Sequence, residues 1–187
     1  MLPSGVFVRA DLDELVSSLP GRLAARGSSR LNVAGEPDTR APKDQAALEV
    51  SSWSEEWCLI EITGPEELTA LIVDCVVNHE PLSEVLPCRF QSRTGDFSYS
   101  LYREGRLMES FESRGPSIET VNFTSDLRRV QLQTLLRASD FMIRSMSHFG
   151  IDPGQRLADE VMKVRFHVSL PGKRSFWQSL LGAVSPR

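Results

Sequence analysis

Residues 97–112 alternate between apolar and polar side chains around the short stretch Arg103-Glu104-Gly105, and this alternation constrains the fold more than any other feature of the chain. Such a pattern predicts two antiparallel strands that form a hairpin with one buried face. A one-residue slip moves every side chain to the opposite face, so the apolar pattern selects the register. We predict a three-residue loop, Arg103-Glu104-Gly105, with Gly105 in the left-handed conformation that glycine adopts without strain.

This register pairs Leu101 with Leu107 and gathers the large apolar side chains on one face, with Glu109 as the only misfit. A two-residue loop would instead leave both faces mixed. The expected buried face consists of Phe97, Tyr99, Leu101, Leu107 and Phe111. The other face is expected to meet water, and it carries Ser98, Ser100, Tyr102, Arg106, Met108, Ser110 and Glu112.

Other segments extend this picture to an α+β chain. Helical spacing of apolar residues predicts helices over residues 11–26 and 125–149, with Pro20 breaking or kinking the first, a possible junction near Ala138 in the second, and Gly150 as the stop of the second. A further helix is expected to open at residues 64–67, with a buried stripe from Leu68 to Val76. A short helical turn is expected over 82–86. Further strands are expected over Gly5–Arg9, 47–53, 57–63, 88–92, 118–123 and 162–170. Strands and helices do not alternate strictly, so we predict an antiparallel β-sheet with a central meander or hairpin and helices packed on one face.

The domain organisation follows from two polar or interrupted stretches. Residues 1–170 are expected to form a single domain, with an exposed mobile loop at about 35–44, where "GEPDTRAPKD" contains two prolines. Pro171-Gly172 separates a short amphipathic segment, 171–187, whose apolar stripe includes Phe176 and Trp177. Three roles stay open for this segment: docking on the domain, binding in a partner's groove, or weak contact with an anionic membrane surface.

Composition excludes several protein classes. No segment approaches the roughly 20 apolar residues of a membrane span, and the N-terminal residues lack the charge and apolar pattern of a signal peptide. The three cysteines, Cys58, Cys75 and Cys88, are odd in number and lack motif spacing. They are expected to be reduced, mostly buried thiols, which favours a cytoplasmic location.

Charge is distributed unevenly along the chain. Residues 1–93 carry 15 acidic and 8 basic side chains, whereas residues 94–187 carry 10 acidic and 13 basic ones. Residues 161–187 contain no aspartate or glutamate, so an anionic partner could bind at this end. The candidate binding residues are Lys163, Arg165 and His167 on the polar face of the last strand, followed by Lys173, Arg174, Phe176 and Trp177.

Sequence motifs for catalysis and cofactors are missing. The chain contains no GxxxxGK[ST], GxGxxG, CxxC, HExxH or GxSxG motif, so we expect no cofactor, no metal site and no nucleic-acid motif. Cys75 and His79 are four residues apart and could share a helix face, where a histidine can activate a thiol. Cys75 also belongs to an apolar stripe, however, so core packing is the preferred interpretation of this cysteine.

These observations favour a non-enzymatic cytosolic protein-binding module, such as an inhibitor, adaptor or immunity-type protein, with another protein as its partner. In general character (short, α+β and acidic in its first half) the chain is similar to small bacterial immunity proteins. The alternative is a small enzyme with a non-motif active site, which could use Cys75 and His79. An enzyme should show a deep pocket with convergent polar groups and a strongly shifted titratable residue, whereas a binding module should show a broad exposed surface.

Overall fold

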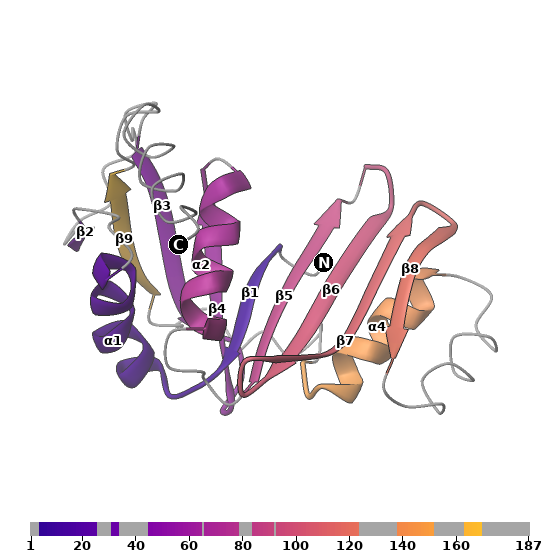
Figure 1. The fold of residues 1–187 in the computed structure, drawn as a ribbon, viewed down its shortest axis with the longest axis horizontal. Helices are drawn as coiled ribbons and strands as arrows, with labels where there is room; N and C mark the ends of the chain where they lie inside the picture. Colours follow the sequence, from indigo (N-terminus) through magenta and orange to yellow (C-terminus); the bar gives the residue numbers. More distant parts are fainter. Residues whose placement is uncertain are drawn as a thin grey trace, which may run out of the picture.

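The computed structural model describes residues 4–25, 31–33, 45–64, 66–78, 84–91, 93–123, 138–151 and 163–169. These residues form one nine-stranded antiparallel sheet and three helices, which confirms the α+β class with an antiparallel sheet (Figure 1). The strands lie in the order β2-β9-β3-β4-β1-β5-β6-β7-β8. The elements are β1 (Gly5–Arg9), α1 (Leu12–Ala25), β2 (Leu31–Val33), β3 (Gln45–Ser52), β4 (Trp57–Thr63), α2 (Glu66–Asn78), β5 (Glu84–Gln91), β6 (Asp96–Arg103), β7 (Arg106–Arg114), β8 (Ser117–Phe123), α4 (Ala138–His148) and β9 (Lys163–Ser169).

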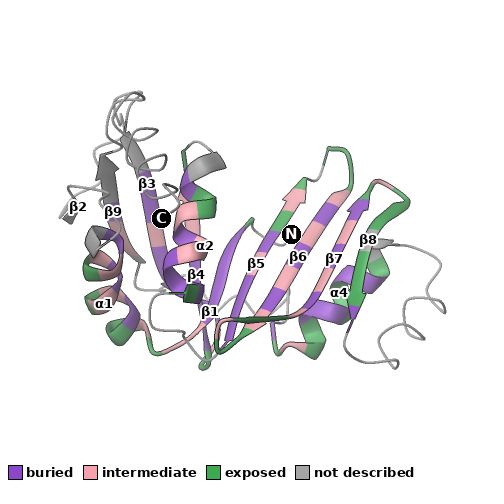
Figure 2. Ribbon diagram, in the orientation of Figure 1, coloured by how far each residue is buried: buried purple, intermediate pink, exposed green. Residues whose placement is uncertain are grey.

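The helices pack on both faces of the sheet, which differs from the prediction that they share one face. Successive side chains of a strand point to opposite faces, so the central strand β1 contributes to two cores. Val6 and Val8 pack with α1 and α2, whereas Phe7 packs with α4 on the other face. Buried positions therefore run through the central strands as well as along the inner sides of the helices (Figure 2).

Helix α1 begins at an aspartate cap. The Asp11 carboxylate accepts hydrogen bonds from the backbone N–H groups of Asp13 and Glu14 at 2.9 and 3.1 Å, which satisfies two donors that the first helical turn leaves open. Pro20 lies inside the helix and does not end it. The buried stripe of Leu15, Leu19 and Leu23 outweighs the loss of one backbone hydrogen bond.

Helix α4 ends where the sequence predicts, at Gly150. This glycine has a φ of 78°, the left-handed conformation of a helix C-terminal cap. The Ile151 N–H donates to the Met146 carbonyl at 2.9 Å, and the Gly150 N–H donates to the Ser147 carbonyl at 3.0 Å. Ile151 is fully buried, so the same turn that ends the helix anchors the chain in the α4 core.

The hairpin between β6 and β7 confirms only part of the predicted buried face, and it does not confirm the predicted loop. The loop has two residues, Glu104 and Gly105, with φ values of 47° and 75°, and it pairs Arg103 with Arg106. A β-bulge then shifts the register, so Leu101 lies opposite Glu109. The predicted three-residue loop and its Leu101–Leu107 pair are therefore wrong. The bulge supplies the extra residue that the longer loop would have supplied.

As a result, four of the five predicted apolar residues share the buried face, while the side chain of Leu107 is 44% exposed. The buried members are Phe97, Tyr99, Leu101 and Phe111. Glu109 shares this face, as the alternation required.

Strand β5 begins earlier than the sequence predicts. Glu84, Val85 and Leu86 belong to the strand, so the short helical turn predicted over 82–86 is wrong where the structure describes it. Pro87 lies in the strand interior, and the register on either side places it opposite Ser100. Pairing between β5 and β6 is interrupted at Leu86 and Pro87, because proline has no N–H to donate.

Candidate functional site

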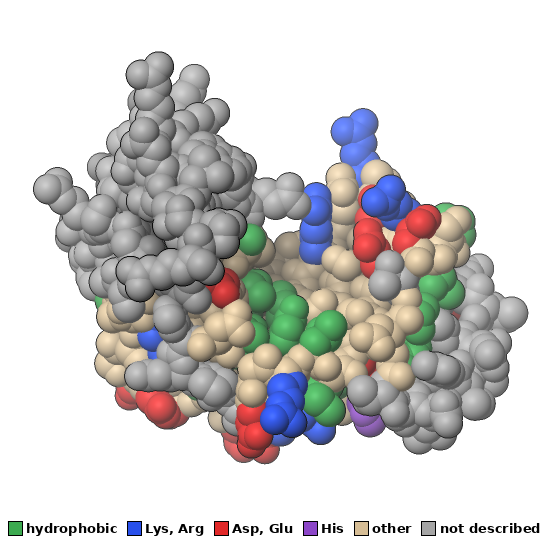
Figure 3. Space-filling view, viewed as in Figure 1, with side chains coloured by type: hydrophobic (Ala, Val, Ile, Leu, Met, Phe, Trp, Pro, Cys, Tyr) green, Lys and Arg blue, Asp and Glu red, His purple; other side chains and the backbone are tan. Residues whose placement is uncertain are grey.

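The described residues leave one half of the sheet uncovered on the face that carries α1 and α2. No helix of the described residues lies over β6, β7 or β8 on this face, because α4 packs behind them (Figure 1). The space-filling view of the same face shows a hollow on the side of α2 that faces this half of the sheet, with charged side chains at its rim (Figure 3). We call this hollow the groove.

Strand register brings polar side chains of different strands together in the groove. Arg89 on β5 lies opposite Ser98 on β6, and Ser98 lies opposite Glu112 on β7. Ser100 lies opposite Ser110 in the neighbouring row. Directly opposed residues of an antiparallel sheet point to the same face. The groove therefore carries three serine hydroxyl groups in two rows, and in one row Ser98 lies between a cation and an anion.

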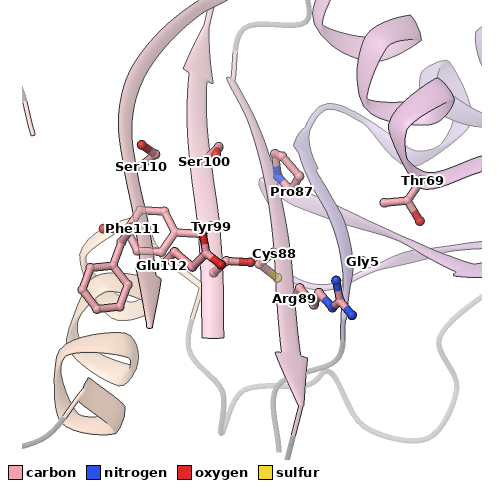
Figure 4. A pocket seen from close by; sticks show the side chains of 11 residues that line it. Gly5, Thr69, Pro87, Cys88, Arg89, Tyr99, Ser100, Ser110, Phe111 and Glu112 are labelled. Carbon is pink, nitrogen blue, oxygen red and sulfur yellow. The ribbon is translucent and has the colours of Figure 1, made fainter. Parts of the chain in front are cut away.

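The groove consists of adjoining hollows of about 430, 360 and 200 Å³, and Arg89 lines all three. Thr69, in the first turns of α2, forms part of the opposite wall. Figure 4 shows the side chains around the largest hollow, including Pro87, Ser100, Ser110 and Glu112. The serines and Glu112 are half-buried, whereas Arg89 and Thr69 are exposed. The site is an open trough and not a closed pocket.

The backbone at the floor of the groove is tightly packed. A Cβ atom on Gly5 would lie 2.6 Å from the Ile60 carbonyl oxygen, so only glycine fits between β4 and β5 at this point. Next to it, the Ser4 hydroxyl donates to the Phe90 carbonyl at 3.0 Å and accepts from the Phe90 N–H at 2.9 Å. These contacts hold β1 against β5 at one side of the groove floor.

Two of the three thiols, those of Cys58 and Cys88, are poorly suited to nucleophilic chemistry. Cys88 borders the groove, but its side chain packs in the core under α4 and the residue is only 7% exposed, and burial raises the pKa of its thiol to about 12. Burial, reinforced by the charge of Asp11, raises the pKa of Cys58 to about 11. Both thiols therefore stay protonated at neutral pH, and a protonated thiol is a weak nucleophile.

The thiol–histidine pair of Cys75 and His79, which the sequence left open as an alternative, stays a prediction, because only Cys75 belongs to the described residues. Its side chain is fully buried in the core beneath α1 and α2, where the Sγ atom lies 3.9 Å from the Arg22 carbonyl oxygen. His79 lies outside the described residues. All three cysteines are free thiols, and all three are buried.

The described part of the chain contains no cluster of histidine, cysteine, aspartate and glutamate that could hold a metal ion. Within the same residues, no helix has the length and apolar character needed to cross a membrane.

A second charged cluster lies at the ends of β1, β5 and β6 on the α4 face. The Glu84 carboxylate pairs with Arg9 at 2.7 Å and with Arg103 at 2.5 Å. Arg9 also pairs with Glu56 and lies over the Trp57 ring, 5.6 Å from its centroid. The hydrogen bond to Glu56 is the largest contribution that raises the pKa of Arg9. The contacts tie β1, β4, β5 and β6 together, so we assign this cluster a structural role.

Only part of the basic surface predicted from the sequence can be located. Arg165 is half-buried, and its backbone lies opposite Glu49 of β3. Its Nε atom has no hydrogen-bond partner in the described part of the protein. Lys163 and His167 pair with Ser51 and Ala47 through the strand backbone. Lys173, Arg174, Phe176 and Trp177 lie outside the described residues, as does the loop at 35–44.

The groove was only partly visible in the sequence. The alternation of residues 97–112 assigned Ser98, Ser100, Ser110 and Glu112 to a polar face, and the structure confirms that they share it. The sequence did not show that Arg89 and Thr69 would join them. That juxtaposition depends on strand order and on which half of the sheet the helices leave open.

The chain matches no protein-family model, no curated protein and no solved structure. Proposals about its function therefore depend on its own geometry.

Proposed function

We propose that this protein is a non-enzymatic protein-binding module that receives part of another protein in the groove. The observation that supports this proposal is the half of the sheet beside α2 that the described residues leave uncovered, where the floor carries hydroxyl groups and opposite charges. An exposed groove built from several strands offers a partner chain many hydrogen-bonding groups along its length. The shape fits a polypeptide segment better than a small molecule, which usually occupies an enclosed and mostly apolar site.

The chemistry of the described residues also favours binding over catalysis. The two thiols with shifted pKa values are shifted away from reactivity, and the only cysteine near the groove is among them. We propose further that the module acts in the cytoplasm as an inhibitor, adaptor or immunity-type protein. Three free thiols support the cytoplasmic location, because such thiols persist in a reducing compartment.

Site-specific photo-crosslinking in cells of the source organism tests the proposal. A photoreactive amino acid is placed at Ser100 inside the groove, and a matched variant carries it at Ser17 on the exposed side of α1. The proposal predicts a defined crosslinked protein from position 100 that is missing from position 17. Equal crosslinking from both positions, or no crosslinked protein from position 100, would contradict binding in the groove.

A further inference from the structure

We infer that the groove recognises an extended peptide segment with one acidic and one basic side chain about three residues apart, with the acidic side chain against Arg89 and the basic one against Glu112. This inference rests on the proposed function and specifies the chemistry of the partner. It follows from the spacing, charge and surroundings of the two groove residues.

The spacing comes from the strand register. Arg89, Ser98 and Glu112 lie directly opposite one another on three adjacent strands. Neighbouring strands are about 4.8 Å apart, so the backbones at Arg89 and Glu112 are about 10 Å apart. A peptide in the extended polyproline II conformation rises about 3.1 Å per residue and completes a turn every three residues, so side chains three residues apart point the same way and lie about 9 Å apart. A segment that crosses the strands thus presents two side chains at the right interval.

The charges remain accessible to such a segment. Arg89 is exposed, and although it already interacts within the chain, its guanidinium carries five donors and can bind a carboxylate as well. Glu112 is half-buried, and its one ion pair among the described residues is a long contact of 3.8 Å with the exposed Arg114. A surface pair of that length contributes little, so Glu112 can exchange it for a cation of the partner.

The groups between the two charges suit a peptide backbone. Ser98 lies between Arg89 and Glu112, and the Ser100–Ser110 pair lies alongside. Each hydroxyl can donate one hydrogen bond and accept others, so these serines can serve both the N–H and the C=O groups of a chain. Their small size leaves the floor low enough for a backbone to approach, while Thr69 of α2 provides a polar wall.

Synthetic peptides test this chemistry without knowledge of the natural partner. The probes are end-blocked decapeptides of glycine and serine that carry aspartate and lysine three residues apart, two aspartates, or two lysines at the same positions. Binding is measured by backbone amide shifts of the labelled full chain. The aspartate–lysine peptide should give saturable shifts in β5, β6 and β7. Arg89→Glu or Glu112→Arg should weaken this binding about tenfold.

The single reversals should also switch specificity. Arg89→Glu should favour the two-lysine peptide, because both ends of the groove become acidic, and Glu112→Arg should favour the two-aspartate peptide. Arg144→Glu on α4, an exposed reversal on the opposite face, is the matched control and should change nothing. Arg89→Gln replaces Arg89→Glu if the latter does not fold.

The inference is overturned if no peptide gives saturable amide shifts of groove residues. It is also overturned if neither Arg89→Glu nor Glu112→Arg changes the affinity for the peptides. These failures differ from a failure of the proposed function. Suppose that a natural partner crosslinks at Ser100 with the same yield in the wild type and in the Arg89→Glu and Glu112→Arg variants. That result would support binding in the groove and would contradict recognition through the charges of Arg89 and Glu112.

Discussion

The Tyr99 hydroxyl donates a 2.7 Å hydrogen bond to a carboxylate oxygen of Glu109, and both residues are buried in the aromatic core under α4. Tyr99 lies on β6 and Glu109 on β7, so the bond links the two strands of the hairpin. It explains how the one charged residue of the apolar face is accommodated, because a buried carboxylate needs hydrogen-bond donors.

Removing the Tyr99 hydroxyl should destabilise the fold. Tyr99→Phe takes a donor from a carboxylate that is 6% exposed, and we expect the free energy of unfolding to fall by about 2 kcal/mol. Tyr102→Phe is the matched control, since the described residues give its hydroxyl no partner, and its effect should be below about 0.5 kcal/mol. Urea titration measures both. Equal losses in the two variants would show that the Tyr99–Glu109 bond has no special role.

The hairpin loop predicts two opposite effects. Gly105 has a φ of 75°, so Gly105→Ala should cost about 1 kcal/mol. Glu104 has a φ of 47°, which is unfavourable for glutamate, whereas Asn-Gly is a preferred pair in such two-residue loops. Glu104→Asn should therefore raise the melting temperature, while Gly105→Ala lowers it. A stabilised Gly105→Ala variant would contradict the loop conformation.

Alkaline pH should weaken the fold through the buried thiols. Burial raises the pKa of Cys58 and Cys88 from 9.0 to about 11 and about 12. Above about pH 9 the unfolded chain loses protons that the folded chain keeps, so the free energy of unfolding falls as pH rises towards these folded values. Urea titrations at about pH 8 and about pH 10.5 measure this fall in the free energy of unfolding. The fall should be smaller in Cys88→Ser than in the wild type. The same fall in both proteins would mean that Cys88 ionises freely in the folded state.

The ion pairs of Glu84 should contribute more to the free energy of unfolding than the ion pair of Glu112 in the groove. Glu84→Gln leaves Arg9 and Arg103 without their shared, largely buried carboxylate, and we expect a loss of about 1–2 kcal/mol. Glu112→Gln removes only a 3.8 Å exposed pair and should leave the melting temperature almost unchanged. Calorimetry distinguishes the two variants. A larger effect for Glu112 would mean that the groove charges stabilise the fold instead of serving a partner.

Short stretches of sequence predicted the strands and helix ends within them well. The order of the strands, and which side chains meet across them, could not be predicted from any short stretch. The strand Gly5–Arg9 and the end of α4 at Gly150 were predicted because alternation and glycine conformation act within a few residues. The bulge between β6 and β7 was missed because a longer loop gives almost the same apolar face. Arg89 was missed because its meeting with Ser98 and Glu112 requires strand order and an uncovered half-sheet.

Blocking the groove tests the central claim most directly. Ser110→Trp fills the hollow from its floor, whereas Ser17→Trp adds the same side chain to the exposed side of α1. Wild type and both variants are immobilised, exposed to extract of the source organism, and compared by quantitative mass spectrometry after their melting temperatures are matched. The account predicts a protein that wild type and Ser17→Trp retain and Ser110→Trp loses. Equal retention by all three, or none by the wild type, would contradict it.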